Sequence, residues 1–317
     1  MAPPSAPSVL ELEARCERGD PQAHYLLGKR YFEGDGVQQD LVKAAELTFV
    51  AAENGVLEAQ YTYGYFCCYG LGVPTDKIQA IRWYRKAADR GYVEAQYGLG
   101  FMCDTGEGIA VNKMEAAKWY LLASDKGHPG AQCNLGNLYF NGWGVRKDKR
   151  EAAELFAKAA EQGNPDAMFN LAHMYEEGDG VPKDDVRALD LYSRASQIGN
   201  PTALYSLGMR YLEGNGVRQD FALAARMFTA SANGGNTDAQ YNLGFMFYYG
   251  KGVPQDLFRA REMFSQAARG WNDRAIYFLG IMYLGGEGVH RDEHRGIGLL
   301  KLAAELGNED ARHVLGR

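Results

Sequence analysis

Apolar and polar residues follow a pattern that recurs from residue 23 almost to the end of the chain. In the first copy Ala23, Leu27 and Tyr31 are spaced so that they share one face of an α-helix. After a turn that contains glycines, Ala44 and Ala51 belong to a second face of the same kind. The pattern therefore predicts pairs of amphipathic helices that are joined by short turns.

Each copy of the pattern is 36 residues long, and no insertion interrupts the series. Eight full copies occupy residues 23–310 and start at alanines 23, 59, 95, 131, 167, 203, 239 and 275. We expect residues 1–7 to form a disordered tail, residues 8–22 an N-terminal capping helix, and residues 311–317 a partial ninth repeat. Because a single pair of helices cannot bury its apolar face, the copies are expected to stack around a continuous core.

Glycine and aspartate mark the expected helix ends. Gly34 and its equivalents are predicted to end each first helix in the left-handed conformation, and Asp40 and its equivalents to cap each second helix. A glycine inside the first helix, Gly28 in the first copy, is unfavourable for a helix and indicates close approach of a neighbouring helix. The seventh copy departs from this pattern, since Gly270 comes one place early and Trp271 occupies the turn.

The common sequence of the copies carries a family resemblance. Its form, Ala-x-x-x-Leu-Gly-x-x-Tyr-x-x-Gly-x-Gly-Val-x-x-Asp-x-x-x-Ala and later Ala-Ala-x-x-Gly, resembles the Sel1-like repeat (SLR), a relative of the tetratricopeptide repeat (TPR). The resemblance implies an all-α fold, a right-handed α/α superhelical solenoid with half-repeat ends, in which the first helices line a concave face. It also implies a protein–protein interaction scaffold or adaptor that binds a peptide, a helix or a domain.

Charge and composition exclude several other classes. A net charge of −6 argues against a nucleic-acid binder, because phosphate contacts need a basic surface. No apolar stretch is long enough for membrane insertion. The chain begins without a recognisable secretory signal, and its five cysteines are odd in number and lack metal-ligand spacing. We therefore expect a cytoplasmic protein with reduced thiols, no metal and no cofactor.

No group of residues in the sequence assembles an acid, a base and a nucleophile, so no enzymatic activity is expected. The triplet from His290 to Asp292 resembles a kinase catalytic loop in letters only, since Asp292 is expected to be a helix cap. Two alternatives remain open. One is a β-lactamase-like hydrolase of the kind found among cysteine-rich SLR proteins, and the other is end-to-end self-association of the solenoid.

The resemblance also indicates where a partner would bind. On a TPR-like stack, the third, seventh, tenth and eleventh positions of each repeat line the concave face, and the last three of these vary between copies. Aromatic residues at such positions are typical of protein interfaces. The candidate partner-binding residues are Tyr65, Tyr69, Phe101, Phe140, Glu176, Phe245, Tyr248 and Tyr249. Alternatively, the rings pack against neighbouring helices. The acidic residues in the middle of the series suggest a partner with some basic residues.

Overall fold

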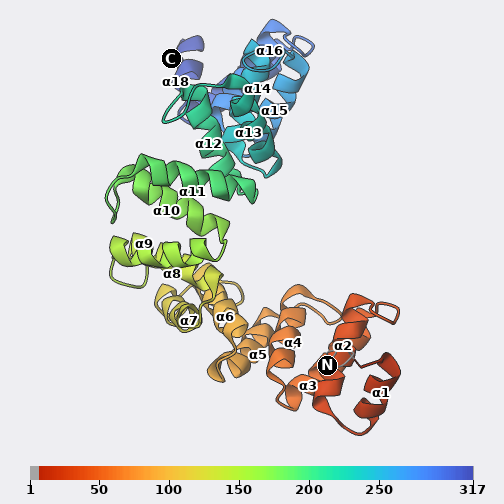
Figure 1. Cartoon of the computed structure of the whole chain (residues 1–317). Coiled ribbons are helices and arrows are strands. Elements are labelled where there is room, and N and C mark those ends of the chain that lie inside the picture. Colours follow the sequence, from red (N-terminus) through yellow and green to blue (C-terminus); the bar gives the residue numbers. More distant parts are fainter. Residues whose placement is uncertain (1–6, 317) are drawn as a thin grey trace. The chain divides into compact units, whose positions relative to one another are not determined.

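The structure is a computed structural model that describes residues 7–316, and the regular elements in this range are all α-helices (Figure 1). The chain divides between residues 162 and 163 into two compact units. The first unit contains α1 (Val9–Glu17), α2 (Pro21–Glu33), α3 (Leu41–Glu53), α4 (Leu57–Tyr69), α5 (Lys77–Asp89), α6 (Val93–Thr105), α7 (Lys113–Asp125), α8 (Pro129–Asn141) and α9 (Lys149–Glu161). The second contains α10 (Pro165–Glu177), α11 (Asp185–Gln197), α12 (Pro201–Glu213), α13 (Phe221–Asn233), α14 (Thr237–Tyr249), α15 (Leu257–Arg269), α16 (Asp273–Gly285), α17 (Glu293–Glu305) and α18 (Glu309–Val314).

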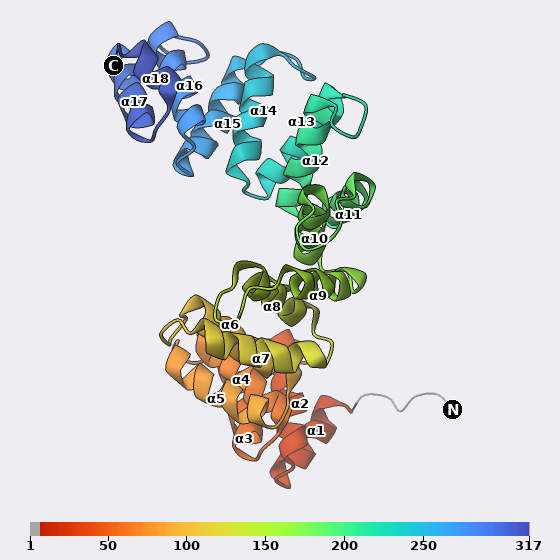
Figure 2. The same cartoon turned by 90° about the vertical axis from the view of Figure 1, so that its left-hand side faces the viewer.

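Within each unit every helix packs against the helix that follows it (Figures 1 and 2). The first helix of each repeat is even-numbered, α2 to α16, and the second is odd-numbered, α3 to α17. These consecutive helix pairs form a repeat solenoid, so the predicted all-α solenoid fold is confirmed. Because equivalent helices begin and end at equivalent repeat positions, residues 36 apart occupy equivalent places and can be compared directly.

The predicted helix caps are present. Gly34 ends α2 with φ of 72°, and the Asp40 carboxylate accepts a hydrogen bond from the Lys43 amide at 3.0 Å. The first helices begin two residues earlier than the alanines that mark the repeats. In α2 this extension arises because the Asp20 carboxylate accepts hydrogen bonds from the amides of Gln22 and Ala23, with Pro21 as the first helical residue.

The glycines inside the first helices allow the two helices of a repeat to come close together, as predicted. A Cβ atom on Gly100 would lie 2.5 Å from the Tyr120 ring, and one on Gly136 would lie 2.7 Å from the Phe156 ring. Both rings are fully buried on the second helix of the same repeat. Glycine therefore leaves the space into which the large ring of the partner helix packs.

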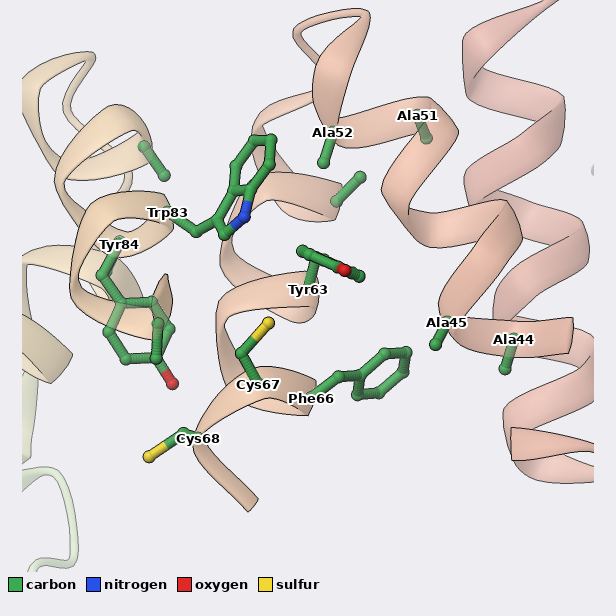
Figure 3. Close-up of a cluster of buried hydrophobic side chains, with 14 of the residues drawn as sticks. Ala44, Ala45, Ala51, Ala52, Tyr63, Phe66, Cys67, Cys68, Trp83 and Tyr84 are labelled. Carbon is green, nitrogen blue, oxygen red and sulfur yellow. The ribbon is translucent and has the colours of Figure 1, made fainter. Parts of the chain in front are cut away.

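Figure 3 shows one part of this core, where α3 supplies small residues and α4 and α5 supply large ones. Tyr63 and Phe66 of α4 extend toward α3, on which Ala45 and Ala52 are buried, while Trp83 of α5 contacts the Tyr63 ring at 5.5 Å between centroids. Cys67 is also buried there, and this burial raises the pKa of its thiol to about 11.

The two ends of the described chain carry short helices. At the N-terminal end Ser8 caps α1 by accepting a hydrogen bond from the Glu11 amide, and Leu12 of α1 is fully buried. At the other end α18 buries Ala311 next to α17. Of the predicted tail, residues 1–6 lie outside the described residues. The predicted limits of the tail, cap and partial repeat remain predictions.

Candidate protein-interaction surface

The candidate partner-binding residues all lie on first helices. Four of them are in the first unit: Tyr65 and Tyr69 on α4, Phe101 on α6 and Phe140 on α8. The other four are in the second unit: Glu176 on α10, and Phe245, Tyr248 and Tyr249 on α14. Whether they contact a partner remains a prediction, but their packing and exposure differ in ways that bear on it.

Tyr65 and Tyr69 form an exposed pair on α4. Their ring centroids lie 4.6 Å apart, as expected for residues one helical turn apart, and Tyr69 is 59% exposed. Phe101 on α6 is also an exposed ring. Beside Tyr69, Lys77 and Glu107 form an ion pair at 2.8 Å that bridges α5 and the turn after α6. The first unit therefore presents ordered aromatic rings to solvent on its first helices.

Phe140 on α8 is half-buried. The Lys149 ammonium group of α9 lies 5.2 Å from the centre of its ring, which is within the range of a cation–π interaction. Phe140 is thus less exposed than Tyr69.

The second unit contains a larger aromatic cluster around α14. Tyr249 is 52% exposed, and its ring lies 4.6 Å from that of Phe245 and 4.8 Å from that of Tyr248. Phe278 of α16 contacts all three of these rings and stacks on the buried Phe264 of α15. Tyr249 is therefore the exposed member of the cluster, and the rings of Phe245, Tyr248 and Phe278 pack against it.

Sequence reasoning missed Phe278, although a signal was present. The same position of the other repeats holds mostly small or polar residues, namely Leu26, Thr62, Gly98, Asn134, Asn170, Ser206 and Asn242. An aromatic residue at a variable position next to the predicted cluster could therefore have been recognised.

Tyr248 is less available than its neighbour. Its hydroxyl donates a short hydrogen bond to the Glu287 carboxylate, and its side chain is half-buried. Burial and this hydrogen bond both raise the pKa of Tyr248, so its phenol is neutral at physiological pH. Tyr248 therefore packs within the cluster, and its hydrogen bond to Glu287 joins α14 to the turn after α16.

Glu176 has partners within its own unit. One carboxylate oxygen accepts a hydrogen bond from the Tyr192 hydroxyl at 2.7 Å, and the other accepts from the Arg210 guanidinium at 2.6 Å. The Arg210 side chain is only 6% exposed. Glu176 therefore neutralises the buried charge of Arg210, and its two hydrogen bonds join α10 to α11 and α12. The sequence did not suggest this role.

The aromatic residues at the third repeat position pack against the second helix of their own repeat, which favours the packing alternative for that position. Tyr61 stacks on Tyr84 with 5.4 Å between centroids, and Tyr241 approaches Phe264 at 6.0 Å. Side-chain packing at this position is part of the core, and the exposed rings lie one or two turns further along the same helices.

The described residues offer few groups for chemistry. Within residues 7–316, no three His, Cys, Asp or Glu side chains are grouped so that they could hold a metal ion. None of the five cysteines, all of which lie within the described residues, forms a disulfide. No helix of this range has the length and apolar character needed to span a bilayer.

Paired helices in a 36-residue repeat define an α/α repeat solenoid of the TPR-like class, a fold typical of protein–protein interaction scaffolds. The model of the Sel1 repeat family matches the chain at residues 21–56, 57–92, 93–128, 129–164, 165–200, 201–236, 237–270 and 273–308. The chain therefore belongs to the Sel1 repeat family.

Two solved structures resemble the chain along almost its whole length. One is c5321, described as a protective antigen of uropathogenic Escherichia coli strains with an SLR fold; it is 35% identical, with a TM-score of 0.81, over 98% of this chain and 67% of the antigen. The other is a Sel1 repeat protein from Oxalobacter formigenes, 32% identical with a TM-score of 0.68, over 98% of this chain and 90% of that protein. Among curated proteins, none matches this chain.

Proposed function

We propose that the chain is a non-enzymatic adaptor that binds a peptide, helix or domain of a partner protein on the concave face formed by its first helices. The observation that carries the proposal is the pair of exposed tyrosines, Tyr69 on α4 and Tyr249 on α14, each held in place by neighbouring rings. Tyrosine combines a large apolar surface with a hydroxyl group, and it is enriched among the residues that dominate binding energy at protein interfaces.

The packing around these tyrosines favours binding. The Tyr65 ring contacts Tyr69, and Phe245, Tyr248 and Phe278 contact Tyr249. Because these rings are already ordered before a partner arrives, binding costs less side-chain entropy than it would on a flexible surface. Each tyrosine therefore acts as an anchor for an apolar side chain of the partner.

The suggested basic character of the partner receives less support. Glu176, the acidic residue chosen for it, already has both carboxylate oxygens occupied by Tyr192 and Arg210. The proposal accordingly rests on the aromatic residues.

We also propose a cytoplasmic location, and the state of the cysteines supports both this location and the non-enzymatic role. Cys67, Cys68, Cys103 and Cys133 are buried, and none of the five cysteines forms a disulfide. Buried cysteines that form no disulfide suit a reducing compartment. The hydrolase alternative was based on disulfide-rich relatives, so turnover of a chromogenic β-lactam by the purified chain would revive it.

The experiment compares three baits in source-cell lysate, followed by mass spectrometry. They are the wild-type chain, a Tyr69→Ser/Tyr249→Ser variant, and a control with Ile78→Ser and Trp143→Ser. The control residues are similarly exposed but lie outside the first helices, on α5 and in the turn after α8. Circular dichroism first establishes that all three are folded.

A partner that binds the wild-type and control baits but not the tyrosine variant would support the proposed site. A partner captured equally by all three baits would contradict it, since binding would then not depend on the aromatic anchors. Loss of the partner from the control bait alone would also contradict it and move the site to the second helices and turns.

A further inference from the structure

A basic groove lies in the second unit, and most of its lining residues belong to second helices and to the turn after α16. Its larger part is a hollow of about 680 Å³ between α15, α16 and the turn before α17, with Arg261, Arg291 and Arg295 in its lining. A smaller hollow of about 290 Å³ continues along α15 to Arg269. The two hollows share Arg261 and Tyr283, so they form one groove, which we call the arginine groove.

Comparison between repeats shows that two of these arginines are departures from the repeat pattern. The position of Arg261 is apolar in every other repeat, where it holds Ala45, Ile81, Ala117, Ala153, Leu189, Ala225 and Ile297. The position of Arg269 is acidic in five others, where it holds Glu53, Asp89, Asp125, Glu161 and Glu305, and an amide in the remaining two. Stacking of the helices therefore requires neither arginine.

The guanidinium groups are oriented by aromatic rings and are little neutralised by acids. Arg261 lies over the Phe258 ring at 4.5 Å, and Arg295 lies over the Tyr283 ring at 4.4 Å. In the described part of the chain, Arg261, Arg269 and Arg295 make no ion pair. Stacking on a ring holds a guanidinium in place while leaving its N–H donors free.

The acidic residues near the groove do not cancel this charge. Asp292 uses its carboxylate to accept a hydrogen bond from the Arg295 amide at the start of α17. Arg291 has only a long contact of 3.8 Å with Glu293, and both side chains are largely exposed. Glu262 lines the smaller hollow without an ion pair in the described structure. The groove thus carries an excess of positive charge in a chain whose net charge is −6.

The spacing of the arginines indicates an extended ligand rather than a single anion. Arg261 and Arg269 are eight residues apart on one face of α15, which places their Cα atoms about 12 Å from each other. A single carboxylate or phosphate would have to draw the guanidinium groups together and away from the Phe258 and Tyr283 rings, whereas a segment with several carboxylates can pair with them in place. The exposed Phe258 ring and Val289 add apolar surface for side chains between the charges.

We propose that the arginine groove is a second binding site, which takes an acidic peptide segment of a partner protein, with its carboxylates on Arg261, Arg269, Arg291 and Arg295 and its apolar side chains on Phe258 and Val289. Arginine pairs carboxylates in a bidentate manner, which gives such a site directional recognition. The site goes beyond the proposed adaptor surface, because these residues belong to the second helices α15 and α17 and to the turn after α16, whereas the adaptor residues lie on first helices.

The test uses the full chain and fluorescence anisotropy of a fluorescein-labelled peptide in which glutamates alternate with leucine and glycine. The test variant is Arg261→Ala/Arg269→Glu, which restores residues found at these positions in other repeats and is therefore expected to fold normally. The control variant, Arg82→Ala/Arg85→Glu on α5, changes the net charge by the same amount at exposed arginines of the first unit. A peptide with glutamine in place of glutamate, inorganic phosphate as a competitor, and phosphatidylglycerol vesicles complete the set.

We expect the wild-type and control chains to bind the glutamate peptide, and the dissociation constant to rise roughly tenfold or more in the test variant. Binding should weaken as salt is raised, and the Tyr69→Ser/Tyr249→Ser variant should bind the peptide as the wild type does.

The proposal would be overturned by an absence of peptide binding to the wild type, by equal binding of the peptide to the test variant, or by equal binding of the glutamine peptide. Strong binding of vesicles with no binding of peptide would also overturn it, in favour of a lipid surface. Complete displacement of the peptide by low concentrations of phosphate would point to a site for single anions and contradict the extended mode.

Discussion

Trp271, in the turn between α15 and α16, has a backbone conformation that its side chain disfavours. Its φ is 61°, and it is the non-glycine residue with positive φ among residues 7–316. The equivalent position in the other seven repeats is glycine: Gly55, Gly91, Gly127, Gly163, Gly199, Gly235 and Gly307. The ring is 67% exposed, so little packing offsets the backbone strain.

Replacing Trp271 with glycine is expected to stabilise the protein by about 1 kcal/mol, because glycine adopts positive φ without steric cost. The urea midpoint of unfolding, followed by circular dichroism, measures the effect. Trp271→Ala is the matched control, since alanine removes the ring but keeps the strain, and it should leave the midpoint nearly unchanged. Equal stabilisation by both changes would show that the exposed ring, and not the backbone, is the source.

Glu176 differs from the other candidate site residues because it neutralises Arg210 inside the second unit. Removing one member of a buried ion pair leaves the other charge without compensation. Glu176→Gln is therefore expected to lower the free energy of unfolding by about 2 kcal/mol, less than for a fully buried pair because Glu176 is partly exposed.

The neighbouring Glu177 provides the control, since it is exposed and Glu177→Gln should change stability by less than about 0.5 kcal/mol. Urea unfolding of the two variants distinguishes them. If Glu176→Gln leaves stability intact but weakens capture of a partner, then Glu176 is a binding residue as the sequence suggested.

At the scale of helices, close packing of α6 against α7 depends on Gly100. A Cβ atom there would meet the ring of Tyr120, which is fully buried and cannot move aside. On the same helix Gly98 has room, since its Cβ would lie 3.5 Å from the Tyr84 ring, an ordinary contact.

We expect Gly100→Ala to destabilise the protein by about 1–3 kcal/mol through overpacking, despite the better helix propensity of alanine. Gly98→Ala should instead stabilise it by roughly 0.5–1 kcal/mol, because only the propensity changes. Thermal or urea unfolding of the two variants measures both effects. Destabilisation of similar size at both positions would mean that the helix pair is not limited by contact at Gly100.

Helices and their caps could be read from the sequence because they depend on local chemistry. Aspartate at Asp40 and glycine at Gly34 act within a few residues, so spacing alone was informative. The helix α2 begins two residues before Ala23, from which the repeat is counted, because Asp20 caps it.

The candidate surface was less predictable because exposure depends on neighbouring helices. Tyr248 and Tyr249 are adjacent in sequence, yet one donates a hydrogen bond to Glu287 and the other faces solvent. Similarly, the pairing of Glu176 with Arg210 joins residues 34 positions apart. Only the packed structure brings such residues together.

At the scale of the whole molecule, several tyrosines and thiols that are buried in the folded state are expected to lower stability at high pH. Burial raises the pKa of Tyr92 to about 12 and that of Cys67 to about 11, and it also raises the pKa of Tyr84, Tyr120 and Tyr192. In the unfolded chain these groups lose their protons near their ordinary values, about 10 for tyrosine and 8.5 for cysteine.

A raised pKa in the folded state means that the unfolded state releases protons first as the pH rises. The stability that these groups provide is complete below about pH 8.5, and it falls as the pH rises through 10 and toward 12. The urea midpoint should accordingly be flat near neutral pH and decrease steeply above about pH 10. A midpoint that stays constant up to about pH 12 would contradict the burial of these phenols.

The constant helix length and capping of the repeats have a consequence for inheritance. Since every copy ends at an equivalent turn, a gene segment that encodes residues 93–128 could be lost or duplicated in frame, and the new junction would again join a second helix to a first helix. Each helix in a unit meets mainly its sequence neighbours, so such an event would preserve the remaining interfaces. The chain can therefore lengthen or shorten its stack of helices by recombination in whole steps of 36 residues, while individual copies differ at single positions such as Arg261 and Trp271.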